Sequence, residues 1–128
     1  KKTGYTETYF GRKRRLSMPN INYNPANKDN ASNKHIDRMA FNTIIQGTAS
    51  EILKLAMIKI HNSFKKEKID AEMIMQVHDE LVFYISESII NQAIGIIIDH
   101  METSSPFSEK LKVDFKIGKY WGDNSYKK

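Results

Sequence analysis

The apolar residues of the chain change their spacing along its length, and the first half contains three patterns. Over residues 5–18, Tyr, Thr and Phe lie on both sides of Gly11, which predicts a β-hairpin that turns near this glycine. Residues 19–32 contain two prolines and five asparagines, a composition typical of an exposed loop. Over residues 33–68, apolar side chains recur three and four positions apart, which predicts one long helix.

The second half contains three further patterns. Residues 73–85 form an apolar run with a polar centre, which predicts two strands joined by a two-residue corner. Residues 87–103 have a broad apolar face and are followed by Pro106, which predicts a second helix that ends before the proline. Residues 111–118 alternate as a half-buried strand does. The order of these elements predicts an α+β fold, with an antiparallel sheet that carries helices on one face.

Gly47 interrupts the long predicted helix. A glycine in a helix interior costs about 1 kcal/mol relative to alanine. We therefore expect that the helix bends at Gly47 or that another segment approaches the backbone there closely.

The composition narrows the class of protein. A chain of 128 residues has the length of one domain, and the lack of cysteine excludes disulfides and thiolate metal sites. No apolar run approaches the roughly 20 residues that span a bilayer, and the first residues lack the apolar stretch of a signal peptide, so we expect a soluble protein without a membrane partner. The net charge of +5 fits a polyanionic partner.

The corner of the predicted 73–85 hairpin is the first candidate for chemistry. The stretch MIMQVHDELVFYI places His78, Asp79 and Glu80 in an apolar run, where burial of a charge is costly. Because two-residue corners favour Asn-Gly or Asp-Gly, the choice of His78 and Asp79 indicates that their side chains are needed. A carboxylate at a strand end, near a second one, suits Mg²⁺ or Mn²⁺. Acids are also common at hairpin tips simply because tips are solvated, so both interpretations stay open.

The long predicted helix carries a polar stripe. Arg38, Asn42 and Gln46 are spaced by four residues and therefore lie on one side of a helix. An arginine with two amides can donate to purine N3 and pyrimidine O2 in the minor groove of a duplex, which are present whatever the sequence. A solvated polar face is the alternative, and it is the more common one for such a stripe alone.

Four consecutive basic residues occupy the second half of the first predicted hairpin: Arg12, Lys13, Arg14 and Arg15. Basic side chains on a strand suit phosphate binding, whereas a charged edge strand that resists aggregation is the alternative. The histidines His35, His61 and His100 lack a second ligand at metal spacing, which favours surface or hydrogen-bonded helix positions over a metal site.

Taken in order, these motifs resemble the C-terminal part of the palm domain of family A DNA polymerases. GYTETYFGRKRR is similar to the basic hairpin of that family, and RMAFNTIIQGTASEILKLAM resembles its long palm helix. MQVHDELVF is similar to the signature of the palm hairpin with a catalytic carboxylate, and VDFKIGKYWGD resembles the closing strand and Trp-containing end. The resemblance covers nearly the whole chain.

The resemblance implies a role for each candidate residue. Asp79 matches the carboxylate that binds two catalytic Mg²⁺ ions, Glu80 matches the acid that supports it, and His78 matches a histidine near the primer terminus. Arg38, Asn42 and Gln46 match helix residues that contact primer and template on the minor-groove side, and Arg15 matches a basic residue near the template. From the basic run itself, we expect Arg12 and Arg14 to contact primer or template as well. The implied partners are primer-template DNA, a deoxynucleoside triphosphate (dNTP) and the remainder of a polymerase chain.

Two parts of the family pattern do not occur in this sequence. The family's other metal-binding aspartate lies in an earlier motif, and the fingers helix that holds the incoming nucleotide also precedes this segment. Two-metal catalysis needs both carboxylates. We therefore expect a template-directed DNA polymerase that acts in DNA replication or repair, of which these 128 residues alone are inactive.

The sequence is also compatible with two alternatives. A non-catalytic DNA-binding module would keep the basic hairpin and the helix stripe, and would bind duplex DNA without regard to Asp79 or Mg²⁺. A metal-dependent hydrolase built on His78 and Asp79 is a weaker alternative, because no second ligand cluster is present. An intracellular location follows from the polymerase interpretation, and both a bacterial cytoplasm and a DNA-containing organelle fit it.

Overall fold

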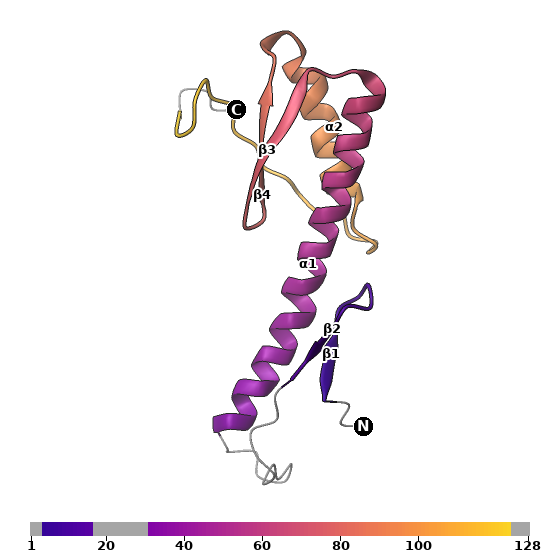
Figure 1. Ribbon diagram of the computed structural model, residues 1–128, viewed down its shortest axis with the longest axis vertical. Helices are drawn as coiled ribbons and strands as arrows, with labels where there is room; N and C mark the ends of the chain where they lie inside the picture. Colours follow the sequence, from indigo (N-terminus) through magenta and orange to yellow (C-terminus); the bar gives the residue numbers. More distant parts are fainter. Residues whose placement is uncertain (1–3, 17–30, 124–128) are drawn as a thin grey trace. The chain divides into compact units, whose positions relative to one another are not determined.

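The computed structural model describes residues 4–16 and 31–123, with side chains from His35 onward in the second range (Figure 1). The predicted loop over residues 19–32 therefore lies almost wholly outside the described residues. The elements are β1 (Tyr5–Glu7), β2 (Lys13–Arg15), α1 (Ala31–Glu67), β3 (Ala71–Val77), β4 (Glu80–Ile85), the 3₁₀ turn η1 (Glu87–Ile89) and α2 (Ile90–Thr103). This mixture of antiparallel strands and helices confirms the α+β class.

The described residues fall into two compact units, divided between Leu55 and Ala56 within α1. The first unit contains the β1–β2 hairpin and the first part of α1. The second contains the last part of α1, the β3–β4 hairpin, η1, α2 and the C-terminal segment.

The β1–β2 hairpin of the first unit closes through a turn that includes Gly11. Strands β1 and β2 pair in an antiparallel register from Tyr5 opposite Arg15 to Glu7 opposite Lys13. The amide of Gly11 donates to the carbonyl of Thr8 at 3.0 Å, and the amide of Arg12 donates to Thr8 Oγ1 at 3.1 Å. Gly11 has a φ of 88°, a left-handed conformation that glycine adopts without a steric cost.

Gly47 allows the hairpin to lie directly on α1. A Cβ at position 47 would lie 2.6 Å from Cγ2 of Thr8, which is far closer than carbon atoms approach in proteins. Of the two expectations for this glycine, the close approach of another segment is the one that the structure shows.

Helix α1 ends through a left-handed residue in the second unit. Lys68 has a φ of 53°, and the amide of Ile69 donates to the carbonyl of Phe64 at 2.9 Å. This hydrogen bond joins residues five positions apart and pairs the Phe64 carbonyl, one of the carbonyls that the regular helix bonds leave without a partner at the helix end. Lys65 and Lys66 in the last turn also favour the end of a helix, where the backbone dipole is negative.

The second unit has its core between one face of the β3–β4 hairpin and the two helices (Figure 1). Ile60 and Phe64 of α1 and Ala93 of α2 are buried at its centre. The hairpin contributes Phe83, whose ring meets Phe64 edge to face at 6.0 Å between centroids. The other residues packed against this centre are Ile69, Ala71, Met73, Leu81, Ile85, Ile96, Ile97 and Met101.

A bulge at Ile74 interrupts the β3–β4 ladder. Met73 pairs with Phe83 and Met75 with Val82, so Ile74 has no residue opposite it. The strands continue to Val77 and Glu80, which flank the two-residue corner.

Two sequence expectations differ from the structure. The described residues form two separate two-stranded sheets in place of one sheet, and only the β3–β4 sheet is packed against both helices in the core. Residues 111–118 form no strand apart from a single bridge residue, Ile117. Their exposure does alternate, with Val113, Phe115 and Ile117 half-buried. An alternating segment becomes a strand only when a neighbouring strand accepts its backbone hydrogen bonds, and pattern alone does not supply that neighbour.

Among the described residues, no helix combines the length and the apolar character needed to cross a membrane.

Candidate nucleic-acid interface and hairpin tip

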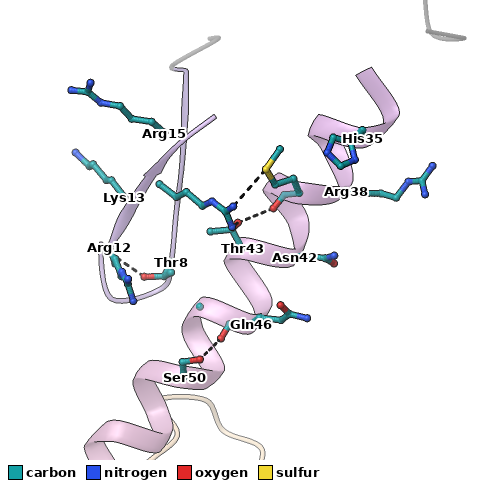
Figure 2. A pocket seen from close by; sticks show the side chains of 13 residues that line it. Thr8, Arg12, Lys13, Arg15, His35, Arg38, Asn42, Thr43, Gln46 and Ser50 are labelled. Atoms are coloured by element: carbon teal, nitrogen blue, oxygen red, sulfur yellow. Dashed lines mark hydrogen bonds between the residues drawn. The ribbon is translucent and has the colours of Figure 1, made fainter. Parts of the chain in front are cut away.

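The basic hairpin and α1 line an open groove of about 940 Å³ within the first unit (Figure 2). The hairpin contributes Thr8 and the run Arg12–Arg15, and the helix contributes His35, Arg38, Met39, Asn42, Thr43, Gln46, Gly47 and Ser50. The sequence predicts contacts with primer or template for His78 of the 73–85 hairpin and for residues of the helix stripe and the basic hairpin. Apart from His78, all of these residues line the groove. This lining contains five Lys or Arg residues and no acidic residue, so the groove suits a polyanion.

The stripe on α1 has the geometry that its spacing predicts. Figure 2 shows Arg38, Asn42 and Gln46 projecting from one side of the helix, and all three are exposed. None of the three side chains makes a hydrogen bond to another described residue that would occupy its donors. The guanidinium and the two amides are therefore available to acceptors on a ligand.

Arg14 is the basic residue that the structure holds most firmly. Its Nη1 donates to Thr43 Oγ1 at 3.1 Å, and its Nη2 lies 3.7 Å from the sulfur of Met39. Thr43 in turn donates its hydroxyl to the carbonyl of Met39 at 2.8 Å. A guanidinium fixed in this way loses less conformational entropy when it binds a phosphate.

Buried threonines fix the hairpin on the helix. The amide of Tyr9 donates to Thr48 Oγ1 at 3.0 Å, and the hydroxyl of Thr6 donates to the carbonyl of Ala40 at 3.4 Å. Thr6, Thr8 and Thr48 are all buried. These bonds connect residues 34 and 39 positions apart in the sequence, and they hold the hairpin against α1.

Two other basic side chains of the hairpin, those of Lys13 and Arg15, point away from the helix (Figure 2). Figure 2 shows Lys13 and Arg15 projecting from the strand on the side opposite α1. The ammonium of Lys13 lies 4.9 Å from the centroid of the Tyr5 ring, a cation–π contact. The alternation that a strand imposes thus splits the basic run, with Arg14 on the helix side.

The corner of the β3–β4 hairpin lies in the second unit and is exposed. His78 and Asp79 form the two-residue turn, and Glu80 opens β4 opposite Val77. His78 has a φ of 54°, and Gln76 Nε2 donates to its carbonyl at 3.1 Å. The apolar run predicts that a charged side chain at this corner would be buried at a cost in free energy. His78, Asp79 and Glu80 are all exposed, so this cost does not arise. The positive φ of His78 is the remaining local cost.

The donor set at this tip fits part of a metal site. Asp79 and Glu80 supply the hard oxygen ligands that Mg²⁺ and Mn²⁺ prefer. Within residues 4–16 and 31–123, however, no group of three acidic, histidine or cysteine side chains is arranged to hold a metal ion. The tip can therefore supply one side of such a site, and further ligands would have to come from elsewhere.

Sequence reasoning missed several residues that position the site. Thr43 holds Arg14, and Thr8 and Thr48 fix the hairpin, yet single threonines carry no distinctive pattern. For His35 the sequence predicts a surface or hydrogen-bonded helix position, and the structure places it exposed on the groove wall beside Arg38. Its position one helical turn before Arg38 is a signal that could have placed it there.

His100 is the histidine with a clear structural partner. Its Nε2 lies 2.7 Å from Ser63 Oγ, so α1 and α2 are bridged within the second unit. This matches the expectation of a hydrogen-bonded helix histidine.

Comparisons with known proteins agree with one another. The model of the family described as DNA polymerase family A matches residues 1–123. DNA polymerase I of Borreliella burgdorferi is 36% identical over 120 residues, which cover 94% of this chain and 13% of that protein. The thermostable DNA polymerase I of Thermus filiformis is 35% identical over 118 residues, which cover 92% of this chain and 13% of that protein.

A solved structure is also similar. The POL domain of Pol1 from M. smegmatis, in complex with DNA primer-template and dNTP, matches with a TM-score of 0.70 and 32% identity. The match covers 85% of this chain and 18% of that one. The chain spans about an eighth of the length of the curated relatives it matches. From the match over residues 1–123, the chain belongs to DNA polymerase family A.

Proposed function

We propose that the chain is part of a template-directed DNA polymerase and that its groove holds the paired end of primer-template DNA. The observation that carries this proposal is the groove itself, which combines five basic residues with an exposed Arg-Asn-Gln stripe in a chain of DNA polymerase family A. In the proposed reaction, the primer 3′-hydroxyl attacks the α-phosphate of a dNTP and pyrophosphate leaves.

The two walls of the groove would have separate tasks. The basic hairpin would bind phosphates, with Arg14 already oriented by Thr43. The helix stripe would donate to minor-groove acceptors through Arg38, Asn42 and Gln46. Because these acceptors have nearly the same positions in every correctly paired base pair, such contacts test pairing without selecting a sequence.

The β3–β4 corner would contribute Asp79 as a ligand of catalytic Mg²⁺, with Glu80 as its support. Bound Mg²⁺ would lower the pKa of the attacking hydroxyl and stabilise charge that develops on the phosphate. His78 would lie near the primer terminus. The exposure of all three side chains at a tight corner supports this assignment, because a metal and a primer end need open access.

The chain alone should not extend a primer. Two-metal chemistry needs a second carboxylate, and the described residues bring no further acid into a cluster with Asp79 and Glu80. Purified chain lacking any further polymerase segment should leave a labelled primer at its original length in the presence of template, dNTPs and Mg²⁺. Template-dependent extension by the chain alone would contradict this expectation.

A non-catalytic DNA-binding module is the second candidate function. The observation that favours it is the same lack of a three-ligand cluster within residues 4–16 and 31–123. Both candidates predict a DNA affinity that depends little on Asp79. They differ in one measurable respect, because the biological activity of a non-catalytic module would not depend on Asp79 or on Mg²⁺.

The experiment compares Asp79→Asn and Gln46→Ala in the full natural protein that carries this chain. Asp79→Asn should lower the primer-extension rate at least about 100-fold and change DNA affinity little, because it removes a metal ligand. Gln46→Ala should weaken binding of paired primer-template about 3- to 10-fold, because one minor-groove hydrogen bond is lost.

Asp70→Asn is the matched control, since Asp70 is an exposed aspartate in the same unit and lies before β3. It should leave both extension and DNA affinity within about twofold of the parent protein. A rate for Asp79→Asn within a few-fold of the parent would refute the metal assignment.

A further inference from the structure

A turn near the C-terminus presents two aromatic rings to solvent. Tyr120 is 74% exposed and Trp121 is 67% exposed, and both lie between Gly118 and Asp123 in the last described segment (Figure 1, yellow). Isolated exposed aromatics are common, but two adjacent large rings on one tight turn are a feature that needs an explanation.

Backbone and side-chain bonds hold this turn in shape. The amide of Lys119 donates to Asp123 Oδ2 at 2.9 Å, and the amide of Asp123 donates to the carbonyl of Tyr120 at 3.0 Å. A Cβ on Gly118 would lie 2.9 Å from both the Cβ and the carbonyl oxygen of Asp123, so only glycine fits there. The two rings are therefore presented by a closed turn, which reduces the entropy that a ligand must overcome.

The segment that leads into the turn is basic. Residues 110–123 contain four lysines, Lys110, Lys112, Lys116 and Lys119, against two aspartates, and all four lysines are exposed. Residues 113, 115 and 117 are half-buried, whereas Lys112 and Lys116 lie at alternate positions between them and share the exposed side. The carboxylate of Asp123 is already bonded within the turn, which leaves Asp114 as the one acid on the exposed side of this stretch.

We propose that this turn is a stacking platform for unpaired bases of single-stranded nucleic acid, with the neighbouring lysines on the phosphates. Aromatic rings stack on the faces of bases, and a duplex hides those faces, so a single strand is the form of nucleic acid that the rings can use. The exposed lysines favour a polyanion over an apolar protein surface. The turn belongs to the second unit and shares no residue with the groove of the first, and the proposal does not depend on the catalytic assignment.

The experiment measures binding of a fluorescein-labelled 16-nucleotide oligo(dT) to the full natural protein by anisotropy. The double variant Tyr120→Ala/Trp121→Ala should weaken binding at least about tenfold, because each stacked base typically contributes that much. Tyr84→Ala is the matched control, since Tyr84 is 72% exposed in the same unit but has no place in the platform. It should leave the affinity within about twofold.

Salt dependence tests the lysines. Lys116→Gln/Lys119→Gln should flatten the slope of log K against log salt concentration by about 1.4, at about 0.7 for each phosphate contact to a single strand. Lys65→Gln/Lys66→Gln removes the same charge from the exposed end of α1 and should leave the slope nearly unchanged.

Photocrosslinking adds a direct readout. An oligo(dT) that carries 5-iodouracil should crosslink to the tryptic peptide from Tyr120 to Lys127, in which Tyr120 and Trp121 are the described aromatics. Unchanged affinity of the Tyr120→Ala/Trp121→Ala variant, or crosslinks confined to other peptides, would overturn the proposal. A lower unfolding temperature of this variant with unchanged affinity would also overturn it, and would show that the rings pack against protein.

Discussion

Replacing Gly47 by alanine tests whether Thr8 determines how the basic hairpin lies on α1. The added Cβ would lie 2.6 Å from Thr8 Cγ2, whereas ordinary contact begins at 3.4 Å, so the atoms must separate by about 0.8 Å. Thr8 cannot simply rotate, because its Oγ1 accepts the amide of Arg12 at 3.1 Å and the residue is only 6% exposed. The hairpin itself must therefore shift.

The expected magnitude follows from two opposing terms. Alanine in a helix is favoured over glycine by about 1 kcal/mol, whereas overpacking at a buried contact costs about 1 to 3 kcal/mol. The net loss in hairpin docking is then up to about 2 kcal/mol, with a central value near 1 kcal/mol, or about fivefold in an equilibrium constant.

Hydrogen exchange of the Tyr9 amide is the assay, because this amide donates to Thr48 Oγ1 across the same contact. Gly47→Ala should lower its protection factor about fivefold. Adding Thr8→Ser removes Cγ2 but keeps Oγ1, and this second change should restore the protection.

Gly95→Ala is the control for helix propensity. Gly95 lies within α2, and a Cβ there would meet nothing within 4 Å, so this variant should gain about 1 kcal/mol of stability. If Gly47→Ala raised the protection of Tyr9, as Gly95→Ala raises stability, the reasoning from the Thr8 contact would be refuted.

Two further predictions concern the groove and the core. Arg14→Lys should weaken duplex DNA binding about 3- to 10-fold, because lysine keeps the charge but lacks the planar guanidinium that Thr43 orients. The slope of log affinity against log salt concentration should stay unchanged. Arg15→Lys, measured by the same salt titration, should change the affinity less than twofold. Ile60→Ala should lower the free energy of unfolding by about 2 to 5 kcal/mol in denaturant titrations, because Ile60 is fully buried, whereas Ile58→Ala at a 58% exposed position should cost less than about 1 kcal/mol.

Local pattern predicted those parts of the structure that depend on one element. The helix period indicated α1 and placed Arg38, Asn42 and Gln46 on one side, because a stripe is a property of a single helix. The cost of Gly47 alone predicted either a bend in the helix or the close approach of another segment, and the structure shows the close approach of Thr8.

Features that depend on two distant segments were not predicted. The contact between Arg14 and Thr43 joins residues 29 positions apart, and the bond from Tyr9 to Thr48 joins residues 39 apart. Threonine is common on strands and in helices, so nothing in the sequence marks these threonines as the ones that bond. The prediction of a strand over residues 111–118 was wrong for the same reason, because a strand needs a second strand to pair with and the pattern does not identify one.

The β3–β4 hairpin shows that an apolar run in the sequence can predict more buried side chains than the structure has. Its inner face packs Met73 and Phe83 on the helices, but its outer face leaves Met75 and Tyr84 exposed. The bulge at Ile74 adds a third exposed apolar side chain. A run that is apolar on both faces therefore does not show that both faces are covered within the described residues. Since His78, Asp79 and Glu80 at the corner between these strands are exposed as well, the fold can place a carboxylate there without burying it.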